Sequence, residues 1–177
     1  MSETLARGGG AHFIARTLLA RRAGNLIGFL ACAGLLGFGY YLQFAKGLEP
    51  CPLCIIQRLL LLGTGLVFLI AAIHHPGRVG AWVYGALTAL VAAVGVAVAT
   101  RHVWLQHTPA DQRPSCGPGL DFLLSNFGPL GGLQRVLRGS GECGAVDWTF
   151  LGLSIPEWTL GWFVAFVLYA LFLAARK

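Results

Sequence analysis

Charge is the property that this sequence has least of. Only 11% of its 177 residues are charged, whereas 56% are hydrophobic, and the mean hydropathy is +0.69. A soluble domain of this length needs far more charge to cover its surface. The scarcity of charge excludes an ordinary soluble protein and predicts an integral membrane protein with a single domain.

Other absences narrow the function. No stripe of basic residues accompanies the net charge of +6, so we expect no nucleic-acid partner. No haem, flavin or nucleotide motif occurs, and there is no internal repeat or low-complexity segment. The basic N-terminal segment has no convincing cleavage site, and the apolar run after it is too long for a signal peptide. We therefore interpret residues 1–24 as a cytoplasmic tail that leads into a membrane helix.

Four apolar runs supply the hydrophobic content. Each is close to the ~20 residues that cross a ~30 Å hydrocarbon core as a helix. Apolar side chains cover the whole circumference of each run rather than one stripe. We predict an all-α integral membrane fold, a bundle of four transmembrane helices. These helices span residues 25–45, 54–73, 79–99 and 158–175.

Glycines are frequent in the first three runs. Because glycine has no side chain, it lets membrane helices approach one another closely. We expect helix contacts at some of the following positions: Gly34, Gly37, Gly39, Gly63, Gly65, Gly85 and Gly95.

Polar segments connect the predicted helices. Residues 46–53 form a short first loop, residues 74–78 a tight turn, and residues 100–157 a long second loop. Within the second loop, Asp121–Arg138 has the pattern of a short amphipathic helix, which we expect on the membrane surface. Residues 176–177 end the chain.

Charge distinguishes the two sides of the predicted bundle. The side with both termini and the 74–78 turn has seven basic residues against Glu3, whereas the other side has six basic and six acidic residues. Lys and Arg in short loops mark the cytoplasmic face. We expect cytoplasmic termini in a bacterial inner membrane, with both loops in the periplasm, where disulfides persist.

Five cysteines divide into two pairs and one remainder. Cys51, Cys54, Cys116 and Cys143 lie in polar or loop segments, whereas Cys32 lies inside an apolar run. We expect Cys32 to be a small packing residue. The four others allow three disulfide connectivities, and their spacing does not choose among them.

The Cys51–Cys54 motif is the strongest chemical signature. A dithiol with two intervening residues indicates redox chemistry or metal binding. Pro52 is tolerated in the first turn of a helix, so the second helix begins near it. Cys54 then lies at a helix N-terminus, which stabilises a thiolate. Structural zinc needs four converging ligands, and the other two loop cysteines form no second motif of this kind, so we predict no metal.

Arg58 follows Cys54 by four residues. It therefore lies on the same helix face, ~6 Å deeper in the membrane. An arginine inside an apolar span is costly and usually functional, although its side chain can also extend to the head groups. The functional interpretation is an anion partner, either for a thiolate at Cys54 or for a carbonyl oxygen that gains charge.

Cys116 and Cys143 lie among glycines and prolines, which indicates flexible, accessible turns. Alone, such a pair indicates a structural disulfide. Next to an exposed redox motif, reversible thiol–disulfide exchange is favoured.

Together these features resemble the DsbB family of bacterial inner-membrane disulfide-forming proteins. The resemblance covers nearly the whole chain from Arg22 onward. It is carried by the CPLCIIQR sequence that opens the second helix, by the Cys116/Cys143 pair, and by residues 148–158, which are similar to the family pattern WxFLGLxxPxW.

The resemblance implies a thiol:quinone oxidoreductase. Such an enzyme reoxidises a DsbA-like periplasmic thioredoxin-fold oxidase and passes two electrons to ubiquinone or menaquinone in the lipid bilayer. By motif match, the partner's thiolate would attack Cys116, and Cys143 would then resolve toward Cys51. Cys54 would deliver the electrons to quinone.

The resemblance also implies residues for the quinone site. Arg58 matches the family's arginine there, and His102 falls where the family has a histidine near it. Gln57 stands where the best-known member has an acidic residue, so we assign it no role. The alternative function is a non-catalytic membrane protein whose outer cysteines form static disulfides or a zinc site.

Overall fold

The structure is a computed structural model. It describes the backbone of residues 4–112, 122, 125–128, 131, 136, 141–144, 146 and 148–176, without the side chains of residues 4–20, 110, 141 and 142. The predicted site residue Cys116 lies outside the described residues, as does most of the predicted amphipathic helix over Asp121–Arg138. The described positions within that segment are helical.

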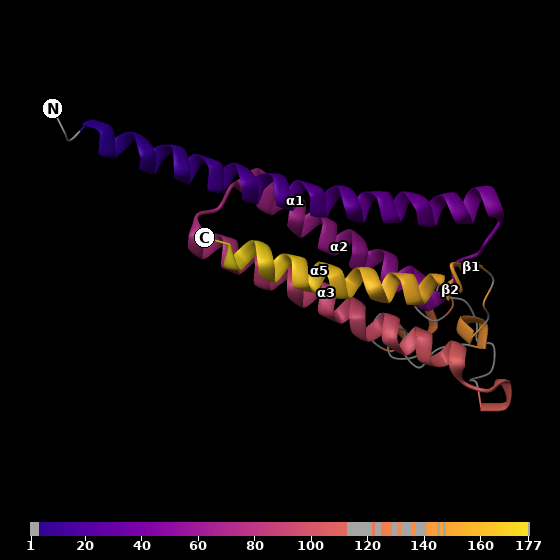
Figure 1. Cartoon of the computed structure of the whole chain (residues 1–177). Coiled ribbons are helices and arrows are strands. Elements are labelled where there is room, and N and C mark those ends of the chain that lie inside the picture. Colours follow the sequence, from indigo (N-terminus) through magenta and orange to yellow (C-terminus); the bar gives the residue numbers. More distant parts are fainter. Residues whose placement is uncertain are drawn as a thin grey trace.

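Four long helices form the molecule (Figure 1), each with a span long and apolar enough to cross a membrane. This confirms the predicted four-helix membrane fold. The helices are α1 (Thr4–Lys46), α2 (Pro52–His74), α3 (Arg78–His107) and α5 (Ile155–Ala175). The short elements are η1 (Ala110–Gln112), η2 (Gly141–Gly144), β1 (Thr149–Phe150) and β2 (Leu153–Ser154).

The helices extend beyond the apolar runs that predicted them. The predicted second loop begins at residue 100, whereas α3 continues to His107, because no proline interrupts it before Pro109. The helix α1 also includes most of the predicted tail, since the first proline of the chain is Pro50. The length of an apolar run indicates which residues cross the hydrocarbon core, but it does not indicate where the helix ends.

The helix α5 begins at Ile155 rather than at the predicted residue 158. Pro156 is in its first turn, where the missing N–H costs nothing. The Glu157 carboxylate accepts hydrogen bonds from the N–H and the hydroxyl of Ser154, at 2.6 Å and 2.9 Å. This cap fixes the start of α5 immediately after β2.

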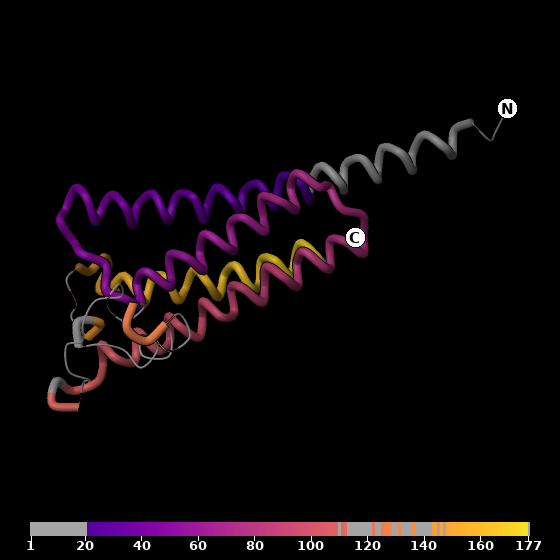
Figure 2. The backbone as a smooth tube through the Cα atoms, turned by 180° about the vertical axis from the view of Figure 1, so that it is seen from behind, coloured from indigo at the N-terminus to yellow at the C-terminus, as the bar shows by residue number. Residues whose placement is uncertain are grey.

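The helices pack as two neighbouring pairs, α1 with α2 and α3 with α5 (Figures 1 and 2). We call one end of the bundle the loop end; it contains the first connection, the end of α3 and the β1–β2 hairpin. We call the other end the termini end; it contains the turn between α2 and α3 and the end of α5 with Arg176.

The contact between α3 and α5 depends on two glycines. A Cβ atom on Gly95 would lie 2.4 Å from the Phe163 ring, and one on Gly85 would lie 2.6 Å from Cβ of Ala174. Any side chain at these positions would push the helices apart. By contrast, Gly34 has no such neighbour within 4 Å. The main core lies between the helices and includes Cys32, 1% exposed, as expected for a packing residue.

The β1–β2 hairpin closes the loop end beside α5. Its strands are antiparallel, and they are joined by Leu151 and Gly152, which have φ of 53° and 82°. This two-residue turn with positive φ at both positions is the type that matches strand twist. Trp158 of α5 donates its indole N–H to the carbonyl of Phe150 (3.0 Å), so the hairpin is fixed against the first turn of α5.

Candidate functional site

A cavity of about 930 Å³ lies at the loop end, bounded by all four helices and the hairpin. This volume is within the range of small-molecule sites, ~300–1,000 Å³. Aromatic side chains form much of its wall: Phe38, Trp148, Phe150, Trp158 and Trp162. Four residues predicted from the sequence also line it: Cys51, Cys54, Arg58 and His102. The structure therefore brings the predicted residues of α2 and α3 to one apolar cavity.

The start of α2 arranges the two thiols. Cys51 is the N-cap residue, and its sulfur accepts a hydrogen bond from the backbone N–H of Cys54 (3.4 Å). The two sulfur atoms are 3.1 Å apart, and the Cys51 thiol donates to the Cys54 sulfur. Both cysteines are free thiols in this structure. Because a disulfide is ~2.05 Å long, a small approach of the two sulfurs is sufficient to join them.

A chain of hydrogen bonds leads toward the Cys54 sulfur. The Gln57 amide donates to Nδ1 of His102 (2.9 Å), so this imidazole has its hydrogen on Nε2. That Nε2 is 3.7 Å from the Cys51 sulfur, and Cys51 in turn donates to Cys54. Because the Cys51 thiol donates its hydrogen to Cys54, the Cys54 sulfur is the favoured position for negative charge.

Burial strengthens this chain. Gln57 and His102 are 4% and 2% exposed, so bulk water does not compete for their hydrogen bonds. His102 comes from α3, whereas Gln57 comes from α2. The pair therefore connects the two helices directly below the dithiol and fixes the orientation of the imidazole.

Cys51 holds its proton at neutral pH because its pKa is raised to about 12. A hydrogen bond with Cys143 lowers the pKa, but this effect is outweighed. The hydrogen bond to Cys54, burial of the thiol, and the charge of Cys54 together raise it. Cys51 is thus the protonated member of the pair, in agreement with the direction of its hydrogen bond.

Cys143 reaches the dithiol from η2. Its side chain is 1% exposed and packs in a cluster with Leu53 and Cys51. It also forms a hydrogen bond with the Cys51 side chain, and its backbone bonds to His102. Three of the four predicted redox cysteines therefore meet at the loop end. The fourth, Cys116, is outside the described residues.

Arg58 is held on the cavity wall by α1. Its Nη1 donates to Oε1 of Gln43 (2.5 Å), and its Nη2 donates to the carbonyl of Gly39 (2.9 Å). The guanidinium also lies over the Tyr40 ring, 5.1 Å from the centroid. These partners lie in the last turns of the α1 span and hold the side chain on the cavity wall. Because all three are neutral, they leave the positive charge of Arg58 undiminished.

Two glutamines of this site were not predicted from the sequence. Gln57 orients His102, and Gln43 anchors Arg58. The signal that the sequence offered was an uncharged polar side chain inside an otherwise apolar helix, a position that usually has a partner. The position of such a side chain in the sequence does not tell which residue of another helix is its partner.

A metal could also be held near the dithiol. One ligand atom from each of Cys51, Cys54 and His102 lies within 4.8 Å of the others. Structural zinc sites almost always have four protein ligands, whereas sites with three keep a position open for water or substrate. The sequence predicted no metal, and this group of three is the observation that keeps a zinc site under consideration.

Comparisons with known proteins cover most of the chain. The model of one family, described as disulfide bond formation protein DsbB, matches residues 21–173. The chain is 50% identical over 152 residues to disulfide bond formation protein B of Xanthomonas euvesicatoria pv. vesicatoria (strain 85-10), across 85% of this chain and 88% of that one. It is 53% identical over 145 residues to the protein of that name from Methylococcus capsulatus (strain ATCC 33009 / NCIMB 11132 / Bath), across 81% and 88%. For Hahella chejuensis (strain KCTC 2396) the identity is 50% over 159 residues, across 90% and 96%.

Proposed function

This chain belongs to the DsbB family of disulfide bond formation proteins, and we propose that it is a membrane thiol:quinone oxidoreductase. Family membership and the four apolar helices make it a multi-pass inner-membrane protein with a role in disulfide formation. The finer proposal is that it reoxidises a DsbA-like periplasmic oxidase and passes two electrons to membrane quinone. The observation that carries this proposal is the directed arrangement of Cys143, Cys51 and Cys54 beside an apolar cavity.

The first half of the reaction is disulfide exchange with the partner. A thiolate of the reduced oxidase attacks Cys116 of a Cys116–Cys143 disulfide, which forms a mixed disulfide and releases Cys143 as a thiolate. The partner's second thiol then displaces Cys116, so the oxidase leaves with its disulfide restored. The electron pair now resides on Cys116 and Cys143, and the two protons of the partner's thiols are released.

The second half moves the electron pair to the motif on α2. The Cys143 thiolate attacks Cys51 of the Cys51–Cys54 disulfide, and Cys54 leaves as a thiolate. The contact between the Cys143 and Cys51 side chains supports this attack, because exchange needs the two sulfurs to meet. Cys116 then closes its disulfide with Cys143, and Cys51 leaves and takes up one of the released protons, which its raised pKa favours.

The cavity fits a quinone. A quinone is an apolar ring with two carbonyl oxygens. This cavity combines an aromatic wall with one arginine, Arg58, whose hydrogen-bond partners are neutral, and with one carboxylate, Glu49. When bound, quinone supplies the two-electron oxidant that restores the Cys51–Cys54 disulfide. Arg58 would bind a carbonyl oxygen and stabilise charge that develops there. His102, with Gln57, would orient the dithiol toward the cavity.

We also propose the orientation in the membrane. The loop end, with the redox cysteines, faces the periplasm, and both termini lie in the cytoplasm. The excess of basic residues at the termini end supports this topology, since Lys and Arg near span ends mark the cytoplasmic face. The dithiol then lies at the periplasmic membrane surface, where a soluble oxidase and a lipid-soluble quinone can both reach it.

The test uses the full-length protein in lipid vesicles that contain ubiquinone or, separately, menaquinone. A reduced thioredoxin-fold dithiol oxidase is added, and quinone reduction is followed by its absorbance. Cys54→Ser should abolish quinone reduction, because the thiol that reacts with the acceptor is lost. Cys32→Ser is the matched control, since Cys32 lies in the core away from the cavity. Normal turnover by Cys54→Ser contradicts the proposal.

The second candidate is a static zinc site, which the grouping of Cys51, Cys54 and His102 favours. Metal analysis of the purified protein and thiol trapping across a series of redox buffers separate the two functions. Stoichiometric zinc together with cysteines that never change oxidation state would establish the second candidate. Quinone-dependent oxidation of the cysteines would exclude it.

A further inference from the structure

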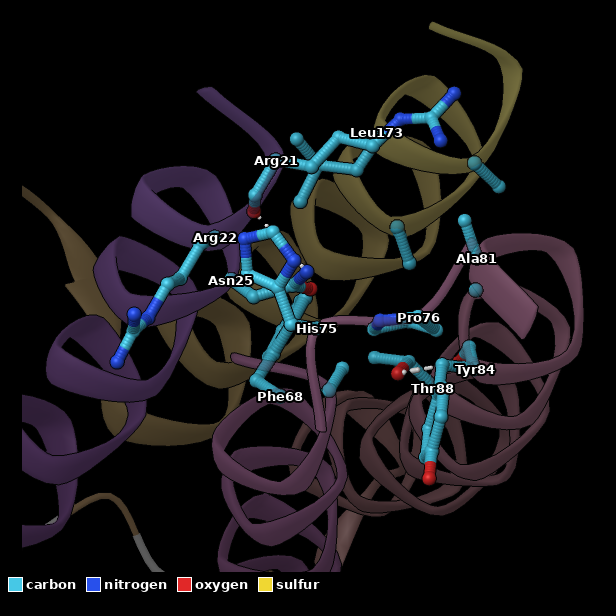
Figure 3. A pocket seen from close by; sticks show the side chains of 14 residues that line it. Arg21, Arg22, Asn25, Phe68, His75, Pro76, Ala81, Tyr84, Thr88 and Leu173 are labelled. Atoms are coloured by element: carbon cyan, nitrogen blue, oxygen red, sulfur yellow. Dashed lines mark hydrogen bonds between the residues drawn. The ribbon is translucent and has the colours of Figure 1, made fainter. Parts of the chain in front are cut away.

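A small cleft lies at the termini end, far from the redox cysteines (Figure 3). It has a volume of about 20 Å³, room for about one water-sized group. Its lining comes from all four helices and includes Arg21, Asn25, His75, Tyr84 and Leu173. The described part of the chain thus contains a second polar pocket, which disulfide formation does not use.

Arg21 has an unsatisfied donor in this cleft. Its Nη2 donates to the carbonyl of Arg176 beyond the last residue of α5, and Figure 3 shows the side chain reaching past Leu173 in that direction. Its Nε is buried and has no hydrogen-bond partner. A buried donor without an acceptor is costly, and more so when it belongs to a charged group. The hydrogen bond to the end of α5 therefore satisfies only part of the hydrogen-bonding capacity of this guanidinium.

Close packing fixes Arg21 in place. A Cβ atom on Gly24 would lie 2.6 Å from Leu173, so α1 and α5 touch one turn away from Arg21. Tyr169 of α5 also donates its hydroxyl hydrogen to the carbonyl of Gly24 (3.0 Å). These two contacts hold α1 against α5 beside Arg21.

Among the described residues, no acidic side chain lies at the termini end. The basic side chains there are Arg21, Arg22, Arg78 and Arg176, at the ends of the membrane spans. The acidic side chains that the structure describes are Glu49, Asp111 and Glu157, and all of them follow or precede a helix at the loop end. The described residues therefore offer no carboxylate to the half-buried Arg21, which leaves room for a counter-ion from outside the chain.

We propose that the mouth of this cleft, beside Arg21 and Arg22, binds the phosphate of an anionic phospholipid. Basic pockets between membrane helices on the cytoplasmic side are suited to anionic head groups. Phosphate offers several acceptor oxygens for a guanidinium. Apolar side chains in the parts of α1, α2 and α3 toward the termini end, namely Ile27, Ile73 and Val79, are 60%, 70% and 79% exposed, so the acyl chains of the same molecule have surface to cover. This two-part surface favours a lipid over free phosphate.

The experiment measures lipid retention by the full-length protein. The protein is taken from bilayer discs with equal phosphatidylglycerol and phosphatidylcholine, and bound lipid is counted by native mass spectrometry. Wild type should retain phosphatidylglycerol preferentially. Arg21→Gln should weaken this retention about fivefold, the equivalent of ~1 kcal/mol for one arginine at a membrane surface. Arg78→Gln removes the same charge from the start of α3, outside the cleft lining, and should change it little.

Three results would overturn the proposal. One is an equal loss in Arg21→Gln and Arg78→Gln, which would mean general surface attraction. Another is no preference for phosphatidylglycerol in the wild type. The third is complete displacement of the lipid by millimolar inorganic phosphate, which would make the ligand an ion. Thermal unfolding of the wild type in each lipid is a second measurement that needs no variant, and it should show higher stability with phosphatidylglycerol.

Quinone reduction separates this proposal from the redox function. Because the cleft and the redox cavity are at opposite ends of the bundle, Arg21→Gln should leave quinone reduction unchanged in the same preparation. Failure of one proposal therefore does not carry over to the other.

Discussion

At the loop end, Arg58 has its guanidinium bound by two neutral acceptors and an aromatic ring. At the termini end, Arg21 has one acceptor, the carbonyl of Arg176, and a buried Nε without any. Both arginines lie within or at the edge of apolar spans, where an unsatisfied cation is costly. The protein gives one arginine two neutral acceptors and leaves the other with a buried donor that has none.

This difference matches the space around each residue. Arg58 lines a cavity of about 930 Å³, into which a whole ring can enter, whereas the cleft of Arg21 measures about 20 Å³. A cation that is already hydrogen-bonded can receive and release a ligand without a large change in its own energy. A cation that lacks a partner should hold its ligand more permanently. The loop end therefore suits turnover, and the termini end suits a structural lipid.

Removing the cation at the loop end should have the largest effect. We expect Arg58→Gln to lower kcat/KM for quinone by about a hundredfold, because one charged donor to a developing oxyanion typically contributes 10²–10³. Arg58→Lys should recover only part of this loss, since an ammonium lacks the guanidinium fork. The measurement is steady-state quinone reduction with a reduced thioredoxin-fold oxidase.

The control for Arg58 is Arg101→Gln. Arg101 is also a basic residue of the loop end, but its guanidinium lies over Trp104, 4.3 Å from the ring centroid, and it does not line the cavity. If both variants lose activity equally, net charge at this end matters and the position of Arg58 does not.

Alkylation of Cys51 should show an effect of similar size. The pKa of Cys51 is raised to about 12, so near pH 8 almost all of it is protonated, and only the thiolate reacts. We expect Cys51 to react with iodoacetamide at least about a hundredfold more slowly than a free cysteine of pKa ~8.5. Its rate should rise tenfold per pH unit up to about pH 12. Peptide mapping after a short exposure measures this rate.

A variant tests the cause of that shift. In Cys54→Ser, the Cys51 thiol loses the partner whose hydrogen bond and charge raise its pKa. Cys51 should then react faster at pH 8 than in the wild type. An unchanged rate would mean that burial alone protects it.

Much of the fold could be predicted because length and composition constrain a membrane helix strongly. The four apolar runs identified the four helices, since each run must satisfy its backbone within lipid. Their ends were less predictable, because α3 and α5 continue into polar sequence where capping and the absence of proline decide. The β1–β2 hairpin escaped prediction because two-residue strands are too short to show a period of two.

Residue spacing predicted the site only where its partners share a helix, whereas His102 and Cys143 were expected near the motif from the family resemblance alone. Cys54 and Arg58 are four residues apart on α2, so spacing alone indicated their common face. The contacts of Gln57 with His102 and of Gln43 with Arg58 join different helices. Such contacts depend on how the helices are rotated against each other, and a single sequence does not specify this. The same limit applies to Arg21, whose buried Nε results from the approach of α1 to α5.

A smaller effect is expected when the neutral partner of Arg58 is made acidic. Gln43→Glu would keep an acceptor for Nη1 but offset the positive charge, so we expect quinone reduction to fall about tenfold. Gln43→Met would lose the hydrogen bond and keep the charge, and Gly39 and Tyr40 would still hold the guanidinium. Its loss should therefore be only about twofold to threefold, within the value of one hydrogen bond. If Gln43→Met lowers quinone reduction more than Gln43→Glu does, the position of the Arg58 guanidinium matters more than its charge.

The smallest effect should come from the contact that fixes Arg21. Tyr169→Phe removes the hydrogen bond to the carbonyl of Gly24, and we expect a loss of about 0.5–1.5 kcal/mol in the free energy of unfolding, without change in quinone reduction. Unfolding in detergent measures the first quantity. Tyr41→Phe, at an exposed position of α1, is the control and should leave stability unchanged. Because Tyr169 holds α1 against α5 beside Arg21, its loss should also weaken the retention of phosphatidylglycerol. A stability loss without weaker lipid retention would mean that Arg21 finds its phosphate independently of this contact, and that the termini end is less rigid than its packing indicates.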